Sequence, residues 1–478
     1  MRRSPRVVFL AAALVAAGCS FVTEFWTFDD DTPVVAFGRP ENYERSPFGA
    51  VLAVRRVPTP EGDATLVAVS AGPGSAAETY RWSVGDRLET DRHVASICSP
   101  ISARVDERDP TDETTCDDSG TGAALLWLAA AAGLGTDPCD EGVLVVGQPN
   151  AGRNALGETV SYGRIAVYCA ATDRTVGTYR QRSATEHLGR ALADWPGGDR
   201  PLVAIGADNA VWLAPVDRLI APGDWTPVWA SPRADPAFGS ALAAGRAAGG
   251  GWLAVGASHL VARSGDSWLA IVRDTNPDPA TAAYEVVACR EDAGPTPLGG
   301  GLAAADLDGD GNDELLAQGA AGILVFDGAG LAARGTAVAT CDLEPGPAVL
   351  SCPADAGDDV ECSAEFGAAI AAGDLDADGA SELLVGDPGA TVAGAARAGA
   401  VHVFVRDGTG WRRAAALRDA VPEAGARLGA ALAVGPVRGR SEPFVGSPGS
   451  GEVFVFYCSG LPGDAPNAPG LGETCRPE

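Results

Sequence analysis

No lysine occurs among the 478 residues of this chain, and aromatic residues make up only 6% of it. Without lysine there can be no phosphate-binding loop of the G-x-x-x-x-G-K-[ST] type, no lysine Schiff base and no pyridoxal anchor. The 35 basic residues are therefore all arginines, and 63 acidic residues outnumber them, which gives a formal net charge of -28. Nucleic-acid binding requires a basic surface, so we expect no nucleic-acid partner.

The sequence also lacks a recognisable catalytic motif. Its four histidines are dispersed and form no H-E-x-x-H pair, and no G-x-S-x-G elbow occurs. Carboxylate pairs are abundant, but incidental pairs are expected in so acidic a chain. We therefore predict that the protein is not an enzyme. The histidines are His93, His187, His259 and His402.

The first residues have the features of an export signal. A basic start is followed by an apolar run from Val7 to Ala17, which is shorter than the roughly 20 residues that cross a bilayer as a helix. The stretch from Ala16 to Cys19 resembles a bacterial lipobox, which implies a signal peptide over 1–18 and a lipidated Cys19. Ordinary cleavage that leaves Cys19 as a free thiol is the alternative. We expect a short tether over 19–27 and a lipid-anchored protein of the bacterial cell envelope, at the outer membrane.

Ten cysteines follow Cys19, an even number that favours disulfides in an exported chain. Their connectivity cannot be read from the sequence. Pairing by proximity along the chain would also tie down the C-terminal tail, 459–478. The pairs suggested in this way are Cys98–Cys116, Cys139–Cys169, Cys289–Cys341, Cys352–Cys362 and Cys458–Cys475.

A repeat organises most of the chain. An aromatic residue or leucine, or threonine in the weakest copy, precedes a glycine and an alanine-rich apolar run. A short strand that ends in glycine follows each copy, and a third apolar strand follows several of them. Runs of this kind, separated by glycine and proline, predict small antiparallel sheets of about four strands. The copies begin at Phe48, Thr121, Leu188, Phe238, Leu298, Phe366 and Leu428.

A single small sheet cannot bury both of its faces, but several sheets arranged radially can, so the repeat predicts a β-propeller. The Phe-Gly step, the later Gly-x-Pro and the acidic loop between them resemble FG-GAP repeats, which form the seven-bladed propeller of integrin α subunits and related bacterial surface proteins. The resemblance covers 28–458 and implies an all-β, seven-bladed fold of four-stranded sheets. It also implies that the segment around Pro33–Phe37 pairs with the last repeat.

Two loops between a first and a second strand carry acidic residues at one shared spacing. Carboxylates at the first, third, fifth and ninth places can converge because a glycine at the sixth place allows a sharp turn, and the seventh residue would add its backbone carbonyl. So many oxygen ligands favour Ca²⁺ over Mg²⁺. The predicted ligands are Asp306, Asp308, Asp310, Asn312 and Glu314 in one loop, and Asp374, Asp376, Asp378, Ala380 and Glu382 in the other.

Two alternatives compete with this prediction. An EF-hand would need a glutamate at the twelfth place and flanking helices, but Ala317 and Val385 stand there and both flanks read as strands. A solvated acidic turn without metal is the other alternative. Because four carboxylates held so closely would repel one another, we expect two calcium sites that brace the fold.

A lipid-tethered, calcium-braced propeller presents loops on a rigid scaffold, where binding usually resides. We therefore expect adhesion or protein–protein interaction, with an envelope protein or a glycan as the partner. A carbohydrate-binding or glycan-hydrolysing propeller is the alternative.

Overall fold

The computed structural model describes the central part of the chain. The predicted signal peptide, the tether, Cys19 and the tail lie outside the described residues. The described residues are 34–38, 48–59, 62–70, 77–82, 93–97, 122–128, 142–149, 163–169, 175–180, 187–195, 202–215, 219, 237–248, 250–258, 266–276, 283–293, 297–334, 341–346, 349–352, 359–376, 379–407, 410–437 and 440–457.

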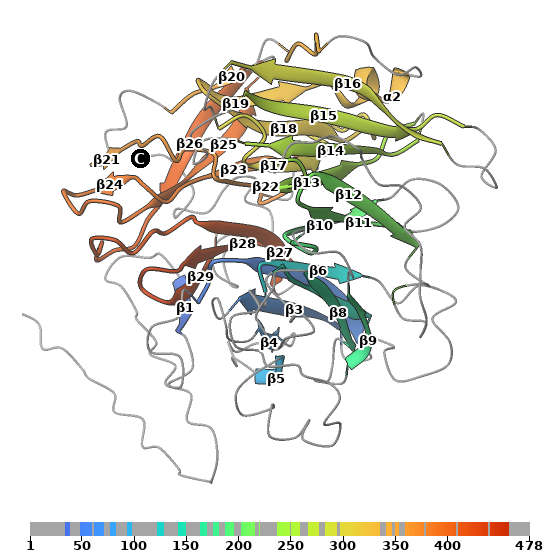
Figure 1. Cartoon of the computed structure of the whole chain (residues 1–478). Helices are drawn as coiled ribbons and strands as arrows, with labels where there is room; N and C mark the ends of the chain where they lie inside the picture. Colours follow the sequence, from blue (N-terminus) through green and yellow to red (C-terminus); the bar gives the residue numbers. More distant parts are fainter. Residues whose placement is uncertain are drawn as a thin grey trace, which may run out of the picture.

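Across these ranges, the strands form seven antiparallel sheets of three or four strands each, and a two-stranded ribbon (Figure 1). In each sheet the strands are consecutive neighbours along the chain, except where the ribbon strand β24 or the N-terminal β1 intervenes. The first three sheets comprise β2 (Leu52–Thr59), β3 (Gly62–Ser70), β4 (Ala77–Trp82) and β5 (His93–Ile97); β6 (Ala124–Leu128), β7 (Val143–Gln148), β8 (Arg164–Cys169) and β9 (Thr175–Arg180); and β10 (Ala191–Trp195), β11 (Leu202–Ala207) and β12 (Ala210–Pro215).

The remaining sheets follow the same plan. A short helix, α2 (Gly328–Ala333), follows β19. These sheets comprise β13 (Ala241–Gly245), β14 (Trp252–Ala257), β15 (Ser267–Asp274) and β16 (Tyr284–Asp292); β17 (Leu302–Ala305), β18 (Glu314–Gly319), β19 (Gly322–Phe326) and β20 (Val349–Leu350); β22 (Ala369–Gly373), β23 (Glu382–Asp387), β25 (Ala400–Asp407) and β26 (Gly410–Leu417); and β27 (Ala431–Val437), β28 (Arg440–Ser447), β29 (Glu452–Phe456) and β1 (Val34–Gly38). The ribbon is β21 (Val360–Glu361) with β24 (Thr391–Val392).

The second strand of most sheets is buried at every position because both of its faces are covered, even where it carries a polar residue such as Glu314. All six residues of β7, β11, β14, β18 and β23 are buried. The first strands differ: β13, β17 and β22 are largely alanine and glycine and are only half-buried. Each first strand contacts the first strand of the next sheet, and β27 of the last sheet contacts β2. Small side chains are therefore placed where the strands of different sheets approach one another.

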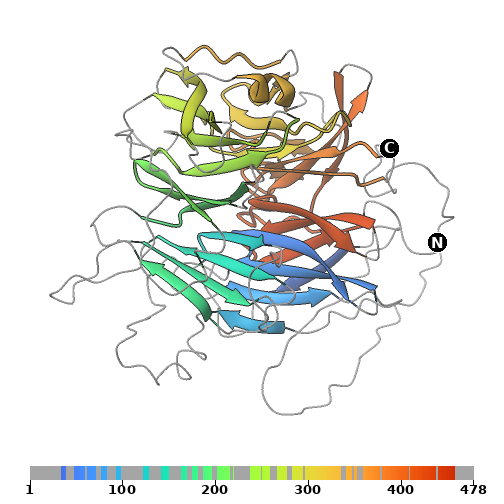
Figure 2. The same ribbon diagram turned by 90° about the vertical axis from the view of Figure 1, so that its right-hand side faces the viewer.

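A separate hydrophobic cluster joins each sheet to the next one along the chain. For example, Leu269 and Ile271 of β15 pack with Leu315 of β18. The last sheet is joined to the first in the same way, since Phe444 of β28 packs with Val67 of β3. Both views show the N-terminal strands, in blue, beside the C-terminal strands, in red (Figures 1 and 2). Contacts between sheets therefore continue from the first sheet to the last and back.

The strand β1 joins the two ends of the described chain. It pairs antiparallel with β29, with Val34 opposite Phe456 and Gly38 opposite Glu452. Its sheet therefore combines one N-terminal strand with three C-terminal strands. This pairing confirms the expectation for the segment around Pro33–Phe37.

Glycines of the repeat allow neighbouring sheets to approach through their backbones. The Gly239 amide, at the start of one repeat, donates to the Gly256 carbonyl at 3.1 Å. Gly256 in turn lies against the next sheet, and a Cβ placed on it would overlap the carbonyl oxygen of Gly299. Gly386 meets Gly429 in the same way. The two glycines of the motif therefore have a packing role, because no side chain fits at this contact.

Two of the five suggested disulfides fall within the described residues, and both are present: Cys289–Cys341 and Cys352–Cys362. The other three lie wholly or partly outside these residues and stay predictions.

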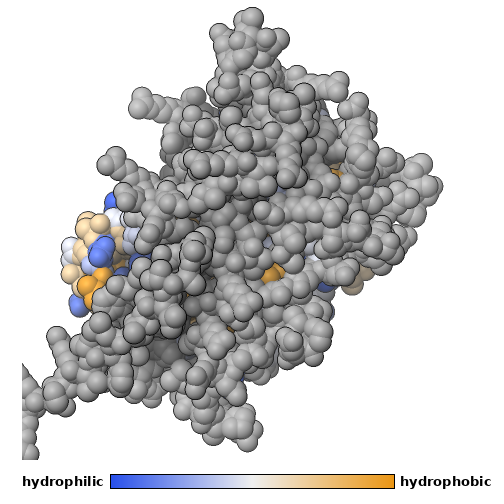
Figure 3. All heavy atoms as spheres, turned by 90° about the horizontal axis from the view of Figure 1, so that it is seen from below, coloured by the Kyte–Doolittle hydropathy of each residue, from blue (hydrophilic) through white to orange (hydrophobic). Residues whose placement is uncertain are grey.

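The described surface carries few large apolar side chains. Among the described residues, Val421 is the one large hydrophobic residue that is mostly exposed, at 67%. Seen from below, the described residues that reach the surface form small areas in which hydrophilic and hydrophobic residues are mixed (Figure 3). Within the same part of the chain, no helix has the length and apolar character needed to cross a membrane.

Candidate metal centre

The first acidic loop connects β17 to β18 and folds around its own carboxylates. Asp306 accepts the Gly309 amide on one oxygen at 2.8 Å and the Gly311 amide on the other at 3.0 Å. Both glycines adopt positive φ angles, 76° and 84°, which most other residues adopt only at a cost. The loop therefore turns back sharply after Asp308, as the glycine at the sixth place predicts.

Three of the predicted ligands of this loop converge. One carboxylate oxygen each from Asp306, Asp308 and Glu314 lies within 4.8 Å of the others. Calcium binds oxygen at about 2.3–2.6 Å, so two oxygens on one ion can lie up to about 5 Å apart. The separation therefore fits a shared cation.

Glu314 anchors the group from the start of β18. It is 7% exposed, and one of its carboxylate oxygens accepts the Leu307 amide at 2.9 Å. Burial raises the pKa of Glu314 to about 7, and the charges of Asp308 and Asp310 contribute to the increase. A buried carboxylate beside other carboxylates is stabilised by a cation, so this environment also fits a metal ligand.

Of the other two predicted ligands of the first loop, Asp310 is placed differently, and the role predicted for the Asn312 backbone carbonyl stays a prediction. The carboxylate of Asp310 lies outside the converging group and accepts the Asn312 amide at 2.8 Å and the Asn312 side-chain Nδ2 at 3.0 Å. These hydrogen bonds lower the pKa of Asp310. The side-chain oxygen of Asn312 accepts the Ala248 amide at 2.8 Å. Asp310 would have to turn away from Asn312 to join the other three carboxylates.

The second acidic loop, between β22 and β23, repeats the arrangement. Carboxylate oxygens of Asp374, Asp376 and Glu382 lie within 4.8 Å of one another. Glu382 is 3% exposed and accepts the Leu375 amide at 2.7 Å, as Glu314 accepts that of Leu307. Asp374 accepts the Gly379 amide at 3.1 Å. Asp378 lies outside the described residues, and the role predicted for the Ala380 carbonyl stays a prediction.

The two loops therefore present the same three carboxylates at the first, third and ninth places. Hard oxygen ligands match the preference of Ca²⁺, and the remaining positions of its coordination shell can be filled by backbone carbonyls and water. Each of these groups can hold a metal ion.

The first loop also makes contacts with both neighbouring sheets. The Asp313 side chain accepts the Arg246 amide at 2.6 Å, and the Asp313 amide donates to the Arg246 carbonyl at 2.7 Å. On the other side, the Arg406 guanidinium lies 3.5 Å from Asp308 and donates to the Leu307 carbonyl at 3.3 Å. The sequence carries no signal for the roles of Asp313 and Arg406, because neither belongs to the metal spacing and Arg406 is distant along the chain.

Comparison with protein families identifies one of the repeats. The family model for the FG-GAP repeat matches 366–404, from Phe366 before β22 to Phe404 in β25. This segment is an FG-GAP repeat. It contains the whole second acidic loop, and repeats of this family often bind calcium and are typical of extracellular or surface proteins. A comparison with curated proteins gives no match. The small antiparallel sheets of the described chain are consistent with an FG-GAP β-propeller.

Proposed function

We propose that the chain forms a closed, seven-bladed, integrin-like β-propeller that acts in adhesion or protein–protein interaction at the bacterial cell surface. The observation that carries this proposal is the continuous series of contacts between sheets. Every sheet shares a hydrophobic cluster with the next, and the cluster containing Phe48, Val67 and Phe444 joins the last sheet to the first. The pairing of β1 with β29 supports closure, because it holds the two ends of the described chain in one sheet.

An interaction role follows from the architecture. An FG-GAP repeat suggests a propeller of the kind that integrins use to bind other proteins. Radially packed sheets make a rigid scaffold, and the loops at their ends are free to vary. Among the described residues, the clusters that could hold a metal are the two acidic loops and a cysteine–histidine group, and the acidic loops are most simply explained as braces of the scaffold.

In this proposal, Ca²⁺ binds at both acidic loops. Asp306, Asp308 and Glu314 would hold one ion, and Asp374, Asp376 and Glu382 the other. The bound ion would offset the repulsion among carboxylates and fix the hairpin between the first and second strands. With an affinity of about 10⁻⁴ M and Ca²⁺ near 1 mM, each site would add roughly 1.4 kcal/mol to the free energy of unfolding.

We also propose that Cys19 is lipidated and anchors the propeller to the outer membrane, which its position after the basic, apolar N-terminal segment supports. The test is a Cys19→Ala variant expressed in a bacterial host with metabolic labelling by a fatty acid. We expect label in the membrane fraction for the unchanged protein and none for the variant. Equal labelling of both proteins would contradict the anchor.

The interaction role is tested by crosslinking on intact cells with and without chelator. We expect the unchanged protein to crosslink reproducibly to a defined surface protein in Ca²⁺, and the Glu314→Gln/Glu382→Gln variant to lose most of that product. An Asp194→Asn variant, altered in β10 of a hairpin without predicted ligands, is the matched control and should keep it. Crosslinking that is equal in all three proteins would contradict a calcium-braced binding surface, and absence of any product with the unchanged protein would contradict the interaction role.

A further inference from the structure

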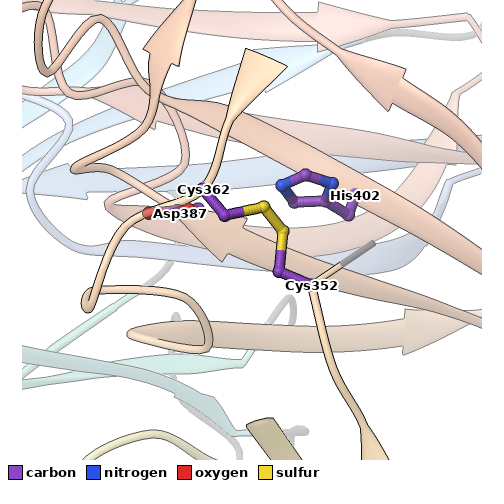
Figure 4. A group of neighbouring side chains, drawn as sticks. All are labelled: Cys352, Cys362, Asp387 and His402. Carbon is purple, nitrogen blue, oxygen red and sulfur yellow. A yellow bond between two sulfur atoms is a disulfide. The ribbon is translucent and has the colours of Figure 1, made fainter. Parts of the chain in front are cut away.

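A second group of potential ligands lies away from the acidic loops. Cys352 follows β20, Cys362 follows β21, Asp387 ends β23 and His402 lies within β25. One ligand atom from each of the four lies within 4.8 Å of the others. Figure 4 shows the two sulfur atoms, joined as a disulfide, between the His402 ring and the Asp387 side chain.

His402 is unusual in its burial. Its side chain is 0% exposed, and neither ring nitrogen has a hydrogen-bond partner among the described residues. Burial, and secondarily Arg413, lower the pKa of His402 to about 3. A neutral imidazole carries one N–H donor and one acceptor, and leaving both unsatisfied in the interior is costly. Its ring packs against the ring of Phe366 in a T-shaped arrangement, at 5.4 Å between centroids, which supplies no conventional hydrogen bond to either nitrogen.

Asp387 is held firmly beside this group. It is 0% exposed, and its carboxylate accepts the Ser363 amide at 2.8 Å and the Ser363 hydroxyl. These bonds fix the segment that carries Cys362 against the end of β23. The cysteines are therefore held next to His402 by a buried, hydrogen-bonded side chain.

We propose that Cys352, Cys362, His402 and Asp387 form a buried Zn²⁺ site that becomes available when the Cys352–Cys362 disulfide is reduced. A dithiol reductant would supply the two electrons and two protons, ending as its own cyclic disulfide and leaving two cysteine thiols. When Zn²⁺ binds, the two thiols release their protons to solvent and coordinate as thiolates. A ring nitrogen of His402 and one oxygen of Asp387 complete the four ligands.

The ligand set and the charge both fit zinc. Tetrahedral Zn²⁺ takes thiolate, imidazole and carboxylate ligands, and its ligand atoms lie about 3.3–3.8 Å apart, so shifts of about 1 Å from the observed positions suffice. Two thiolates and one carboxylate carry three negative charges, which Zn²⁺ and the nearby Arg413 would balance. A neutral total charge is what a buried site requires. Zinc would also give the His402 nitrogen the partner that it lacks.

The test measures Zn²⁺ binding to the full chain after treatment with dithiothreitol, with Ca²⁺ at saturating concentration to occupy the acidic loops. Other reduced cysteines also bind zinc, so the informative quantity is the difference between variants. We expect Cys352→Ala/Cys362→Ala to bind one Zn²⁺ fewer per chain than the unchanged protein. In contrast, Cys289→Ala/Cys341→Ala, which removes the other described disulfide, should retain that site.

His402→Leu provides the second readout. Because the imidazole has no hydrogen bond to lose, the variant should fold, and its affinity for Zn²⁺ at this site should fall at least tenfold. Co²⁺ bound in place of zinc should show a thiolate-to-metal charge-transfer band that changes in His402→Leu and is lost in Cys352→Ala/Cys362→Ala. Equal zinc stoichiometry in both cysteine variants, or unchanged affinity and Co²⁺ spectrum in His402→Leu, would overturn the proposal. Neither result depends on the proposed interaction role.

Discussion

The β13–β14 hairpin and the β17–β18 hairpin occupy the same position in successive sheets, but different interactions hold their loops. Eight residues after Leu298, the start of its repeat, the second hairpin has Asp306, while eight residues after Phe238 the first has Arg246. The acidic hairpin gathers three carboxylates around one point. The loop of the arginine-bearing hairpin is bound by the neighbouring acidic loop. The Arg246 amide donates to the Asp313 carboxylate. The Ala248 amide donates to the Asn312 side chain.

Asp194, near the end of β10, extends the comparison to a carboxylate that belongs to no metal-binding group among the described residues. Partial desolvation raises the pKa of Asp194, although the residue is exposed, whereas Arg246 and then Arg55 lower it. This aspartate therefore has arginine counter-charges from two other sheets. If the proposed calcium sites are occupied, the difference is one of counter-charge: arginines serve a single acid such as Asp194, and a metal ion serves a converging set of carboxylates.

Removal of calcium is expected to have the largest effect on this comparison. If both acidic loops bind Ca²⁺, chelation should lower the free energy of unfolding by about 2.8 kcal/mol relative to 1 mM Ca²⁺. Urea unfolding with and without chelator measures the difference. Identical unfolding curves would mean that the acidic loops, like the arginine-bearing hairpin, are not stabilised by calcium.

Breaking a glycine contact should lower stability about equally beside the arginine-bearing hairpin, at Gly256 of β14, and beside the second acidic hairpin, at Gly386 of β23. The loss should not depend on bound Ca²⁺. Gly256→Ala and Gly386→Ala each push a methyl group into the backbone of the next sheet, and we expect a loss of about 2 kcal/mol in both. Gly346→Ala is the control, since its Cβ would meet its nearest neighbour at an ordinary 3.4 Å. Unfolding in urea should show the same loss with and without Ca²⁺. A loss in only one of the two variants would mean that the glycine contacts do not have the same packing role in all sheets.

Neutralising the buried glutamate of one acidic loop tests that loop's calcium site separately from the other. Glu314→Gln and Glu382→Gln keep an oxygen for the Leu307 and Leu375 amides but remove a charged ligand. Each should abolish about half of the stabilisation by Ca²⁺, roughly 1.4 kcal/mol, with little effect in chelator. Thermal melting at several Ca²⁺ concentrations measures this. Asp194 has arginine counter-charges, so the Asp194→Asn variant should retain the full stabilisation by Ca²⁺. A reduced stabilisation would contradict the distinction between arginine-paired and metal-binding carboxylates.

The smallest expected effect comes from Asp313, whose contact with the β13–β14 hairpin can be removed without affecting metal binding. Asp313→Ala removes the side-chain acceptor of the Arg246 amide and should lower the free energy of unfolding by about 1 kcal/mol. Calcium titration should be unchanged, because Asp313 is not part of the converging group. A variant that lost one calcium ion would show that the two functions of the loop are inseparable.

Much of the fold follows from local sequence. The starts of the repeats predict the first strands, which begin three or four residues later, for example β13 at Ala241 after Phe238. Second strands such as β14 and β23 appear where apolar runs end in glycine. These predictions succeed because strand period and turn residues act over a few positions.

The long-range parts of the site could not be predicted in the same way. The acidic spacing points to Asp306, Asp308 and Glu314, but it cannot show that the Asp310 carboxylate turns to Asn312. The approach of Arg406 to Asp308, and of His402 to the Cys352–Cys362 pair, depends on how different segments of the chain pack against one another. No local pattern encodes such contacts.

Calcium stoichiometry tests the central claim most directly. Equilibrium dialysis against 1 mM Ca²⁺, with the bound metal measured by atomic emission, should find about two specifically bound ions per unchanged chain. It should find one for either Glu314→Gln or Glu382→Gln, and none for the double variant. Absence of bound calcium in the unchanged protein, or two ions retained by the double variant, would contradict the account.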